Sequence, residues 1–299
     1  MTAIIFGSKY PSKPLETLLD IFRIIDESGV KVWIHLEFLK FLESKKVVLK
    51  DVNSFTDMTS LPVAILKDKD TIAISIGGDG TYLRTAWQVM EYKLPVLGVN
   101  LGRLGFLAAI SGDVFRQAWE HILRKEYRVI ERSMIDIYTE KEGHTTEQGT
   151  VLNEVVVSKK DSGSMISIEA QIDDQRVATY LADGLIISTP TGSTAYSLSV
   201  NGPIIAPNTS TFCLTPVAPH MLNMRPLVVA DDSEIRLKVS ARNLSFLLVA
   251  DGKTSSLSCN TVLCLKKSKE NIRSIQIFGY NFYQTLRDKL MWGIDPREV

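Results

Sequence analysis

The fold of this chain follows from the stretch Thr71-Ile-Ala-Ile-Ser-Ile-Gly-Gly-Asp-Gly-Thr81, where an apolar run opens into three glycines and a carboxylate. The residues before the glycines are apolar on both faces, as in a central strand of a helix-covered parallel sheet. After them, apolar residues from Tyr82 to Met90 recur at helical spacing. We therefore expect a buried strand, a polar turn and a helix.

The turn is a candidate phosphate site. Gly77, Gly78, Gly80 and Thr81 would place backbone amides at a helix N-terminus, where partial positive charge attracts phosphate. Asp79 would repel phosphate unless a metal ion lies between them or the carboxylate takes a proton from an attacking hydroxyl. A phosphate loop that carries a base is what a kinase needs. An ordinary tight turn would also explain these residues, and they match neither the P-loop nor the Rossmann motif.

Composition bounds the class of protein. The chain has 299 residues, 45% of them hydrophobic, which fits two ordinary domains or one large one. Its 34 basic and 34 acidic residues balance, so we expect no nucleic-acid partner. Cys213, Cys259 and Cys264 form no Cys-x-x-Cys pair, which favours reduced thiols in the cytosol. No basic leader or membrane-length apolar run is present, so we expect a soluble cytoplasmic protein without membrane contact.

The N-terminal part alternates strand and helix patterns. Apolar strands at 3–6, 30–34, 72–76 and 94–99 are separated by helical stripes, of which those at 15–25 and 113–125 are the clearest. This order predicts an α/β domain over 1–128 with a parallel sheet covered on both faces. Residues 40–62 show no assignable pattern, and 125–132 is interpreted as a charged crossing.

Beyond residue 128 the apolar period changes to two. Alternation recurs at 135–137, 166–172, 235–239 and 275–277, which predicts a mostly antiparallel, β-rich domain over 129–280. A last helical pattern from Phe282 to Leu290 follows. We expect the segment 281–299 to return to the first domain and pack against it.

The stretch Asn100-Leu-Gly-Arg-Leu-Gly-Phe106 follows the strand at 94–99. It should therefore lie at the same carboxyl edge of the sheet as Asp79, where open α/β sheets bind ligands. Phe106 could stack on a base, although a phenylalanine after a glycine-rich turn more often belongs to the core.

Residues 180–203 form the densest polar stretch in the chain. Their many hydroxyls and turn amides suit the polar edges of a nucleotide, and the apolar residues around them indicate a turn inside folded structure instead of a surface loop. Asn153 and Glu154, before an apolar strand, could read a purine edge and ribose hydroxyls. An ordinary strand boundary would also explain that pair.

Together these stretches closely resemble the NAD kinase family, in this order and spacing, from about residue 70 to about residue 255. Gly-Gly-Asp-Gly-Thr is shared with diacylglycerol and sphingosine kinases, and more loosely with phosphofructokinases. Asn-Glu combined with Asp-Gly and Thr-Pro-Thr-Gly-Ser-Thr-Ala-Tyr-Ser is close to diagnostic of NAD kinases.

The resemblance implies phosphorylation of the adenosine-ribose 2′-hydroxyl of NAD to give NADP. The donor would be ATP or another phosphoryl donor such as polyphosphate. A divalent cation, usually magnesium, would arrive with the donor phosphates, with no metal site from the protein alone. The resemblance also implies a homodimer or homotetramer, and it agrees with an α/β domain followed by a β-rich domain.

By matched position the resemblance assigns the site residues. Asp79 would be the general base and contact NAD. Asn153, Glu154 and Asp183 would hold the sugars and rings, Phe106 would lie beside the adenine pocket, and Arg84 could reach phosphate. The remaining implied NAD contacts are Gly80, Thr191, Thr194, Ala195, Tyr196, Ser197, Leu198 and Ser199.

Two positions depart from the family pattern. Lys253 follows Asp251-Gly252 where a glutamine is more usual, and Leu181 stands where many members have a basic residue. A lipid or sugar kinase with the same loop, and a non-catalytic dinucleotide sensor, are the alternative functions. The evenly mixed charge argues against the lipid kinase, and the presence of Asp79 against the sensor. The choice of NAD or NADH, the donor and feedback control are left open.

Overall fold

The computed structural model describes residues 1–8, 15–47, 49, 51–102, 105–161, 163–279 and 281–293. Contacts divide the chain into two compact units. Unit 1 comprises Met1–Glu131 and Ile272–Val299, and unit 2 comprises Arg132–Asn271. Each unit has its own hydrophobic core.

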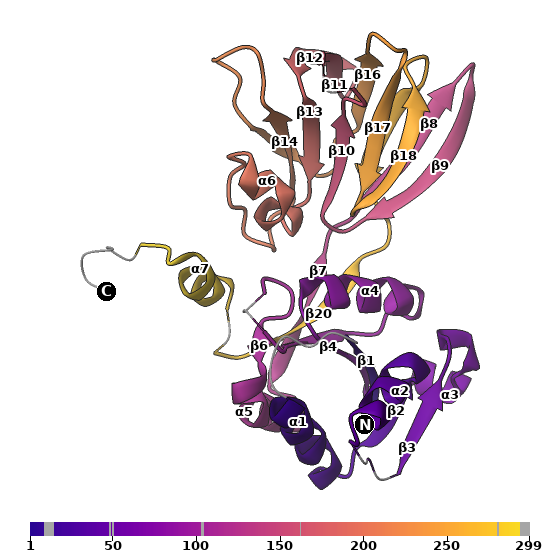
Figure 1. The fold of residues 1–299 in the computed structure, drawn as a ribbon, viewed down its shortest axis with the longest axis vertical. Coiled ribbons are helices and arrows are strands. Elements are labelled where there is room, and N and C mark those ends of the chain that lie inside the picture. The colour runs from indigo at the N-terminus through magenta and orange to yellow at the C-terminus, as the bar shows by residue number, and fades with distance from the viewer. Residues whose placement is uncertain are drawn as a thin grey trace. The chain divides into compact units, whose positions relative to one another are not determined.

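Unit 1 contains an eight-stranded sheet among the described residues, in the order β3-β2-β1-β4-β5-β20-β7, with β6 beside β5 (Figure 1). The pairs from β3 through β20 are parallel, as predicted. The strands are β1 (Thr2–Gly7), β2 (Lys31–His35), β3 (Val52–Phe55), β4 (Thr71–Ile76), β5 (Val96–Asn100), β6 (Ile110–Ser111), β7 (Tyr127–Arg132) and β20 (Ile272–Ile277).

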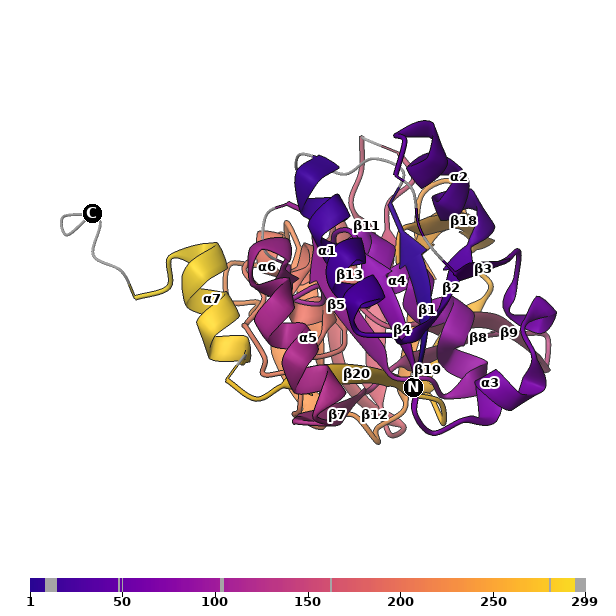
Figure 2. The same cartoon turned by 90° about the horizontal axis from the view of Figure 1, so that it is seen from below.

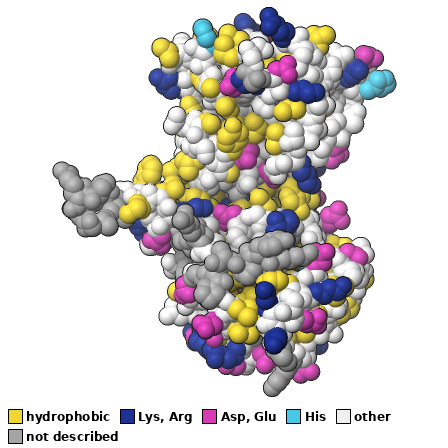
Figure 3. All heavy atoms as spheres, viewed as in Figure 1, with side chains coloured by type: hydrophobic (Ala, Val, Ile, Leu, Met, Phe, Trp, Pro, Cys, Tyr) yellow, Lys and Arg dark blue, Asp and Glu magenta, His cyan; other side chains and the backbone are white. Residues whose placement is uncertain are grey.

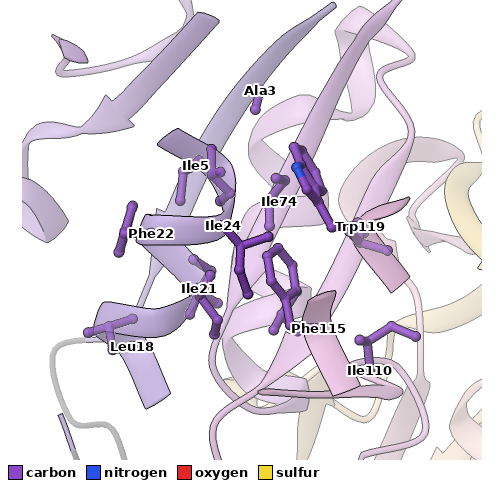
Figure 4. Close-up of a cluster of buried hydrophobic side chains, with 14 of the residues drawn as sticks. Ala3, Ile5, Leu18, Ile21, Phe22, Ile24, Ile74, Ile110, Phe115 and Trp119 are labelled. Atoms are coloured by element: carbon purple, nitrogen blue, oxygen red, sulfur yellow. The ribbon is translucent and has the colours of Figure 1, made fainter. Parts of the chain in front are cut away.

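Helices cover both faces of this sheet, which explains why all six residues of β4 are buried. α1 (Leu15–Glu27), α2 (Leu36–Ser44) and α5 (Phe115–Leu123) lie on one face, and α4 (Asp79–Val89) lies on the other (Figures 1 and 2). Side chains of α1 and α5, among them Phe22 and Phe115, gather on Ile5 and Ile74 of the sheet (Figure 4). The short α3 (Val63–Lys67) directly follows the segment that has no assignable sequence pattern.

Two strands differ from the sequence-based expectation. The alternation at Ile275 and Ile277 predicts a strand of the β-rich domain, but β20 pairs in parallel with β5 of unit 1. Its neighbour β7 occupies the expected charged crossing. A period of two marks a half-buried strand without saying which sheet it joins. The boundaries between the units therefore fall at 131/132 and 271/272 instead of at 128/129 and 280/281.

Unit 2 consists of two six-stranded antiparallel sheets among the described residues, as the period of two predicts. Their orders are β15-β14-β13-β10-β17-β18 and β12-β11-β16-β19-β8-β9, and alternate residues of both sheets form one core. The elements are β8 (Ile135–Lys141), β9 (His144–Val151), β10 (Glu154–Ser158), β11 (Ile166–Ile172), β12 (Gln175–Ala182), β13 (Gly184–Ser188), α6 (Tyr196–Ser199), β14 (Thr211–Val217), β15 (Leu227–Ala230), β16 (Ile235–Ser240), β17 (Ser245–Ala250), β18 (Lys253–Ser258) and β19 (Val262–Lys267).

The last helix, α7 (Phe282–Leu290), has the predicted bounds and belongs to unit 1. Asn281 caps it, since its side chain accepts the N–H of Gln284. The Phe282 ring lies 5.9 Å from the ring of Phe106, which confirms that the helix packs on the α/β unit.

The surface mixes charges of both signs. On the face shown in Figure 3, basic and acidic side chains are interspersed. Within the described ranges, no helix combines the length and apolar character needed to cross a bilayer.

Candidate active site

The turn after β4 begins helix α4. Gly78 is the N-cap residue, and its carbonyl accepts the N–H groups of Thr81 and Tyr82 at 2.9 and 3.1 Å. The helix thus begins at Asp79, three residues before Tyr82, where the apolar stripe starts. The N–H groups of Asp79 and Gly80 belong to the first turn, whose donors have no intrahelical acceptor and commonly bind phosphate.

The Asp79 carboxylate is tied to a segment that follows β5. Its Oδ1 accepts the N–H groups of Leu107 and Ala108 at 3.0 and 2.9 Å, and its Oδ2 accepts that of Phe106 at 3.0 Å. Hydrogen bonds to a charged acceptor are roughly twice as strong as neutral ones. The carboxylate is therefore held in one position, at the carboxyl edge of the sheet where the sequence places both segments.

Gly105 makes this close approach possible. A Cβ atom on Gly105 would lie 1.9 Å from Oδ1 of Asp79, so any side chain there would displace the carboxylate or the loop. The sequence indicates this residue only as one glycine of the 100–106 stretch. Arg103 and Leu104, which precede it, lie outside the described residues.

Lys289 of α7 also reaches Asp79. Its Nζ lies 3.6 Å from Oδ2 of Asp79 and 4.5 Å above the centre of the Phe106 ring. Oδ2 thus faces one N–H group and a lysine, while Oδ1 accepts two N–H groups. The sequence does not single out Lys289, because an isolated lysine on an amphipathic helix usually faces solvent.

Arg84, expected to reach phosphate, stays beside the loop. Its guanidinium donates to the Thr81 hydroxyl at 3.2 Å, and the residue is exposed. An exposed guanidinium can exchange a neutral hydroxyl for an anionic group, because charge-assisted hydrogen bonds are the stronger ones.

In unit 2, Asn153 and Glu154 form a turn held by Asp251. The Asp251 carboxylate accepts the N–H groups of Leu152, Asn153 and Glu154 at 2.7, 2.9 and 3.0 Å. The N–H of Asp251 donates in return to the carbonyl of Glu154 at 3.2 Å. This turn is more than an ordinary strand boundary, because three successive N–H groups converge on one side chain.

The opposite side of the same turn is hydrogen-bonded to Thr189 and packed against Gly192. The backbone N–H of Thr189 donates to the carbonyl of Asn153 at 2.9 Å, and its hydroxyl donates to that of Leu152 at 2.5 Å. A Cβ on Gly192 would lie 2.0 Å from the Asn153 carbonyl oxygen. The Asn-Glu pair and the Thr-Pro-Thr-Gly segment, far apart in sequence, therefore form one constellation.

Glu154 is the most perturbed carboxyl group of this constellation. Burial, and secondarily the charge of Asp251, raise its pKa to about 7, against the opposing effect of a hydrogen bond from the Tyr196 N–H. Its Oε2 is buried and has no hydrogen-bond partner among the described residues. Such a buried atom has an unused capacity to accept a hydrogen bond.

Most hydroxyls of residues 191–199 bond within the protein. Ser193 donates to the Pro190 carbonyl at 2.7 Å, Thr194 donates to that of Thr191 at 3.2 Å, and the Ser197 hydroxyl lies 3.0 Å from that of Thr215. The hydroxyl-rich sequence thus shapes the turn itself. Tyr196 is 45% exposed, and the remaining members with at least partial exposure are Thr194, Ala195, Leu198 and Ser199.

Asp183 is paired with a lysine that the sequence does not single out. The Nζ of Lys159 lies 2.7 Å from Oδ1 of Asp183, and the Lys159 N–H donates to the Asp183 carbonyl. Leu181, which replaces a basic residue of the family pattern, is exposed nearby on β12.

Metal ligands do not converge within the described residues: no three His, Cys, Asp or Glu side chains there could hold a metal ion together. Both Asp79 oxygens are engaged by backbone N–H groups. Magnesium usually keeps several waters and binds substrate phosphates with one or two carboxylates. The divalent cation expected with the donor phosphates stays a prediction.

The candidate residues fall into two groups, one in each unit. Unit 1 carries the turn 77–81, Arg84 and Phe106, and unit 2 carries Asn153, Glu154, Asp183 and the segment 191–199. In unit 2, Asn153 and Glu154 meet residues 189–192, whereas Asp183 lies at the other end of β13: Glu154 pairs with Ser188, but Gly184, next to Asp183, pairs with Ser158. That the two groups serve one dinucleotide stays a prediction.

Comparison with known proteins adds independent information. The model of the ATP-NAD kinase N-terminal domain matches residues 12–127, and that of the ATP-NAD kinase C-terminal domain matches residues 152–277. An NAD kinase of Bacteroides fragilis is 40% identical over 297 residues, covering 99% of this chain and 100% of that protein. One of Porphyromonas gingivalis is 42% identical over 293 residues, covering 98% of each.

Two solved structures share the fold. A yeast NADH kinase complexed with NADH superposes with a TM-score of 0.83 at 20% identity, covering 99% of this chain and 89% of that one. An NAD kinase from Archaeoglobus fulgidus in complex with ATP superposes with a TM-score of 0.67 at 22% identity, covering 96% of this chain and 99% of that one.

Proposed function

Because this chain belongs to the NAD kinase family and phosphorylates NAD to give NADP, we propose that its turn 77–81 receives the donor phosphates. In this proposal Asp79 deprotonates the 2′-hydroxyl of the adenosine ribose. The observation that carries this proposal is the Asp79 carboxylate, which three N–H groups hold at the first turn of α4. A base fixed beside a phosphate-binding helix end has the position that phosphoryl transfer requires.

Oδ2 of Asp79 is the oxygen assigned to proton transfer. It accepts one hydrogen bond, with the Lys289 ammonium 3.6 Å away, whereas Oδ1 accepts two. Oδ2 is therefore the oxygen with fewer hydrogen bonds to the protein. As the ribose oxygen forms its bond to the terminal phosphorus of ATP, its proton passes to Oδ2, and the bond from that phosphorus to the ADP oxygen breaks. The N–H groups of the turn stabilise the charge that develops on the phosphoryl oxygens. Magnesium bound to the donor phosphates would neutralise part of their charge.

Unit 2 is assigned to the dinucleotide. The unpartnered Oε2 of Glu154 supports hydrogen bonding to a ribose hydroxyl, with Asn153 and Asp183 beside other polar edges of the sugars and rings. The exposed Tyr196 ring and the neighbouring Ala195 support an adenine pocket. In this proposal Thr191, Thr194, Ser197, Leu198 and Ser199 give that pocket its shape.

The reaction assay tests this function directly. Purified protein is incubated with ATP, magnesium and NAD, and NADP is measured with an NADP-specific dehydrogenase. We expect NADP to accumulate, and to fail to accumulate when magnesium is chelated. Folded protein that gives no product above a control without enzyme would contradict the proposed function.

Gly80→Ala should separate stability from activity. A Cβ at this helical position meets only the Arg84 guanidinium, at 3.9 Å, and alanine favours a helix over glycine by about 1 kcal/mol. The melting temperature should therefore rise slightly. If phosphate occupies the space above the turn, the methyl group displaces it, and kcat/KM for ATP should fall at least about tenfold.

A matched control for this variant is Gly163→Ala. A Cβ on Gly163 also meets open space, and the residue lies outside the proposed site. It should leave kcat/KM unchanged. Full activity in Gly80→Ala would show that the turn does not approach the phosphates.

Glu154 predicts a pH-dependent affinity for NAD. Its pKa of about 7 means that the carboxyl group is largely neutral at pH 6 and charged at pH 8. A carboxylate accepts stronger hydrogen bonds from ribose hydroxyls than a neutral carboxyl group does. The KM for NAD should therefore fall as pH rises through about 7, and Glu154→Gln should flatten that dependence. An unchanged pH profile in this variant would remove Glu154 from the NAD site.

The same pKa has a consequence for the free enzyme. Because the pKa in the folded protein, about 7, lies above the ordinary value of 4.5, Glu154 stabilises the fold below pH 4.5, and this contribution is lost as pH rises to about 7. The glutamine side chain of the Glu154→Gln variant has no charge to bury. Urea unfolding at pH 5 and pH 8 should therefore show a smaller stability difference for the variant than for the unaltered enzyme.

We further propose that the protein works in the cytoplasm as a homodimer or homotetramer. The free thiols Cys213, Cys259 and Cys264 fit a reducing compartment. Exposed apolar side chains on and around α7, namely Phe278, Tyr283, Met291 and Trp292, support contact with a second copy of the chain. Analytical ultracentrifugation measures the assembly, and a monomer at assay concentrations would contradict it.

A further inference from the structure

Asp251 lies in the tight turn between β17 and β18. Asp251 and Gly252 both have positive φ, 43° and 83°, and they form a two-residue hairpin loop. Asp-Gly is a favoured sequence for such loops. The loop alone would explain the residue type, but it does not explain where the side chain goes.

The carboxylate leaves its own hairpin and accepts three successive N–H groups of residues 152–154. Three successive N–H groups can point at one carboxylate only if the backbone curves around that carboxylate. Backbone of this shape commonly binds anions. Here the anion is part of the protein. Without the Asp251 carboxylate, these three N–H groups would point at the same place and have no acceptor there.

We propose that Asp251 is a positioning residue for NAD: its carboxylate holds the Asn153–Glu154 turn in the conformation that presents both side chains to the dinucleotide. This inference rests on the proposed role of Asn153 and Glu154 in binding NAD. Asp251 itself is hydrogen-bonded to the backbone and need not touch the ligand.

The surroundings show that the turn is held from two sides. Thr189 binds the carbonyls of Leu152 and Asn153, and Gly192 packs against the latter. Asp251 supplies the matching acceptor for the N–H groups on the other side. Burial raises the pKa of Asp251, and the three N–H groups act to lower it, so the hydrogen bonds offset part of the cost of burying the charge.

The test is Asp251→Asn in the full-length enzyme. Asparagine keeps the preference for this hairpin loop, but its amide nitrogen replaces one acceptor with a donor facing N–H groups. The KM for NAD should rise about ten- to hundredfold, as expected when buried donors lose a charged acceptor, while KM for ATP stays unchanged and kcat changes far less. An unchanged KM for NAD would overturn the proposal.

Asp231→Asn provides a matched control in the same unit. Asp231 is also buried: it accepts a hydrogen bond from the Ser133 hydroxyl at 3.2 Å and forms an ion pair with Lys267 at 2.8 Å. It does not contact the Asn153–Glu154 turn. It should lower the melting temperature without changing KM for NAD. An equal rise of that KM in both variants would show a general loss of structure and contradict positioning.

Asn153→Ala separates this inference from the proposed NAD site. If Asn153→Ala leaves KM for NAD unchanged, the assignment of the turn to NAD fails. If Asn153→Ala raises KM but Asp251→Asn does not, the turn binds NAD and the positioning role fails. With both correct, the double variant should raise KM by clearly less than the product of the two single effects, because the residues act through one turn.

If Asp251→Asn does not fold, amide hydrogen exchange of the unaltered enzyme tests whether Asp251 holds the turn. In the unaltered enzyme without NAD, the N–H groups of Leu152 and Asn153 should be protected from exchange, since each donates to the Asp251 carboxylate. Fast exchange of both in folded protein would overturn the proposal.

Discussion

Asp79→Asn should lose at least about a hundredfold in kcat, with a much smaller change in the KM for NAD. A ribose hydroxyl is a poor nucleophile at neutral pH, and a positioned base typically contributes about 10²–10⁴-fold. Asparagine has the same shape and can still hydrogen-bond the hydroxyl, but it cannot take the proton. Steady-state kinetics for NAD and ATP measure both parts of this expectation.

A structural role of Asp79 would also explain such a loss of kcat, and the structure excludes one such role. Gly78, not Asp79, occupies the N-cap position of α4, so helix capping by Asp79 does not account for the residue. The alternative that remains is that Asp79 holds the segment 105–108, where an asparagine amide would face the Phe106 N–H. That role would raise KM or lower stability together with kcat. A loss of kcat that far exceeds the change in KM is specific to the base.

Asp57→Asn is the matched control in unit 1. The Asp57 carboxylate also accepts backbone N–H groups, those of Thr59 and Ser60, but it caps a short helix outside the proposed site. It should cost some stability and leave kcat unchanged. If Asp79→Asn keeps more than about a tenth of the original kcat, the base assignment is wrong, since even the low end of the general-base range exceeds that loss.

Ala195→Trp should prevent NAD from binding while the protein stays folded. Ala195 lies between the 3-10 helix Gly192–Thr194 and α6, next to the exposed Tyr196 ring, and is itself partly exposed. An indole there has room toward solvent but would fill the proposed adenine pocket. We expect KM for NAD to rise at least about a hundredfold, because the pocket would lose most of the adenine contact.

Ala206→Trp tests whether any added indole in this region has the same effect. Ala206 is also partly exposed and lies in the following loop, outside the proposed site. Its KM for NAD should stay within about threefold of the original, the usual outcome for a surface change. Near-normal KM in Ala195→Trp, with circular dichroism showing a folded protein, would place the adenine pocket elsewhere.

The sequence by itself determined the local architecture. The apolar residues Ile72, Ala73, Ile74 and Ile76 predicted the buried central strand β4, and the helical stripe of Phe282 to Leu290 predicted α7 with its observed bounds. Alternation predicted the antiparallel sheets of unit 2. These features depend on which side chains face a core, and a repeat of side-chain polarity records that along a few neighbouring residues.

Tertiary structure decided the sheet that β20 joins and the partners of the polar side chains. Asp79 binds N–H groups 27 to 29 residues away, and Asp251 binds N–H groups 97 to 99 residues away. Lys159 and Lys289, which pair with Asp183 and Asp79, have no signature in the sequence.

The hydroxyls of Ser193 and Ser197 show the same division. Their density predicts a polar site, but the structure turns them inward to the Pro190 carbonyl and the Thr215 hydroxyl. A hydroxyl or carboxylate has the same composition signal whether it binds a ligand or the backbone. Its role is set by which donors and acceptors the folded chain brings within about 3 Å of it, and that distance is a property of the tertiary structure alone.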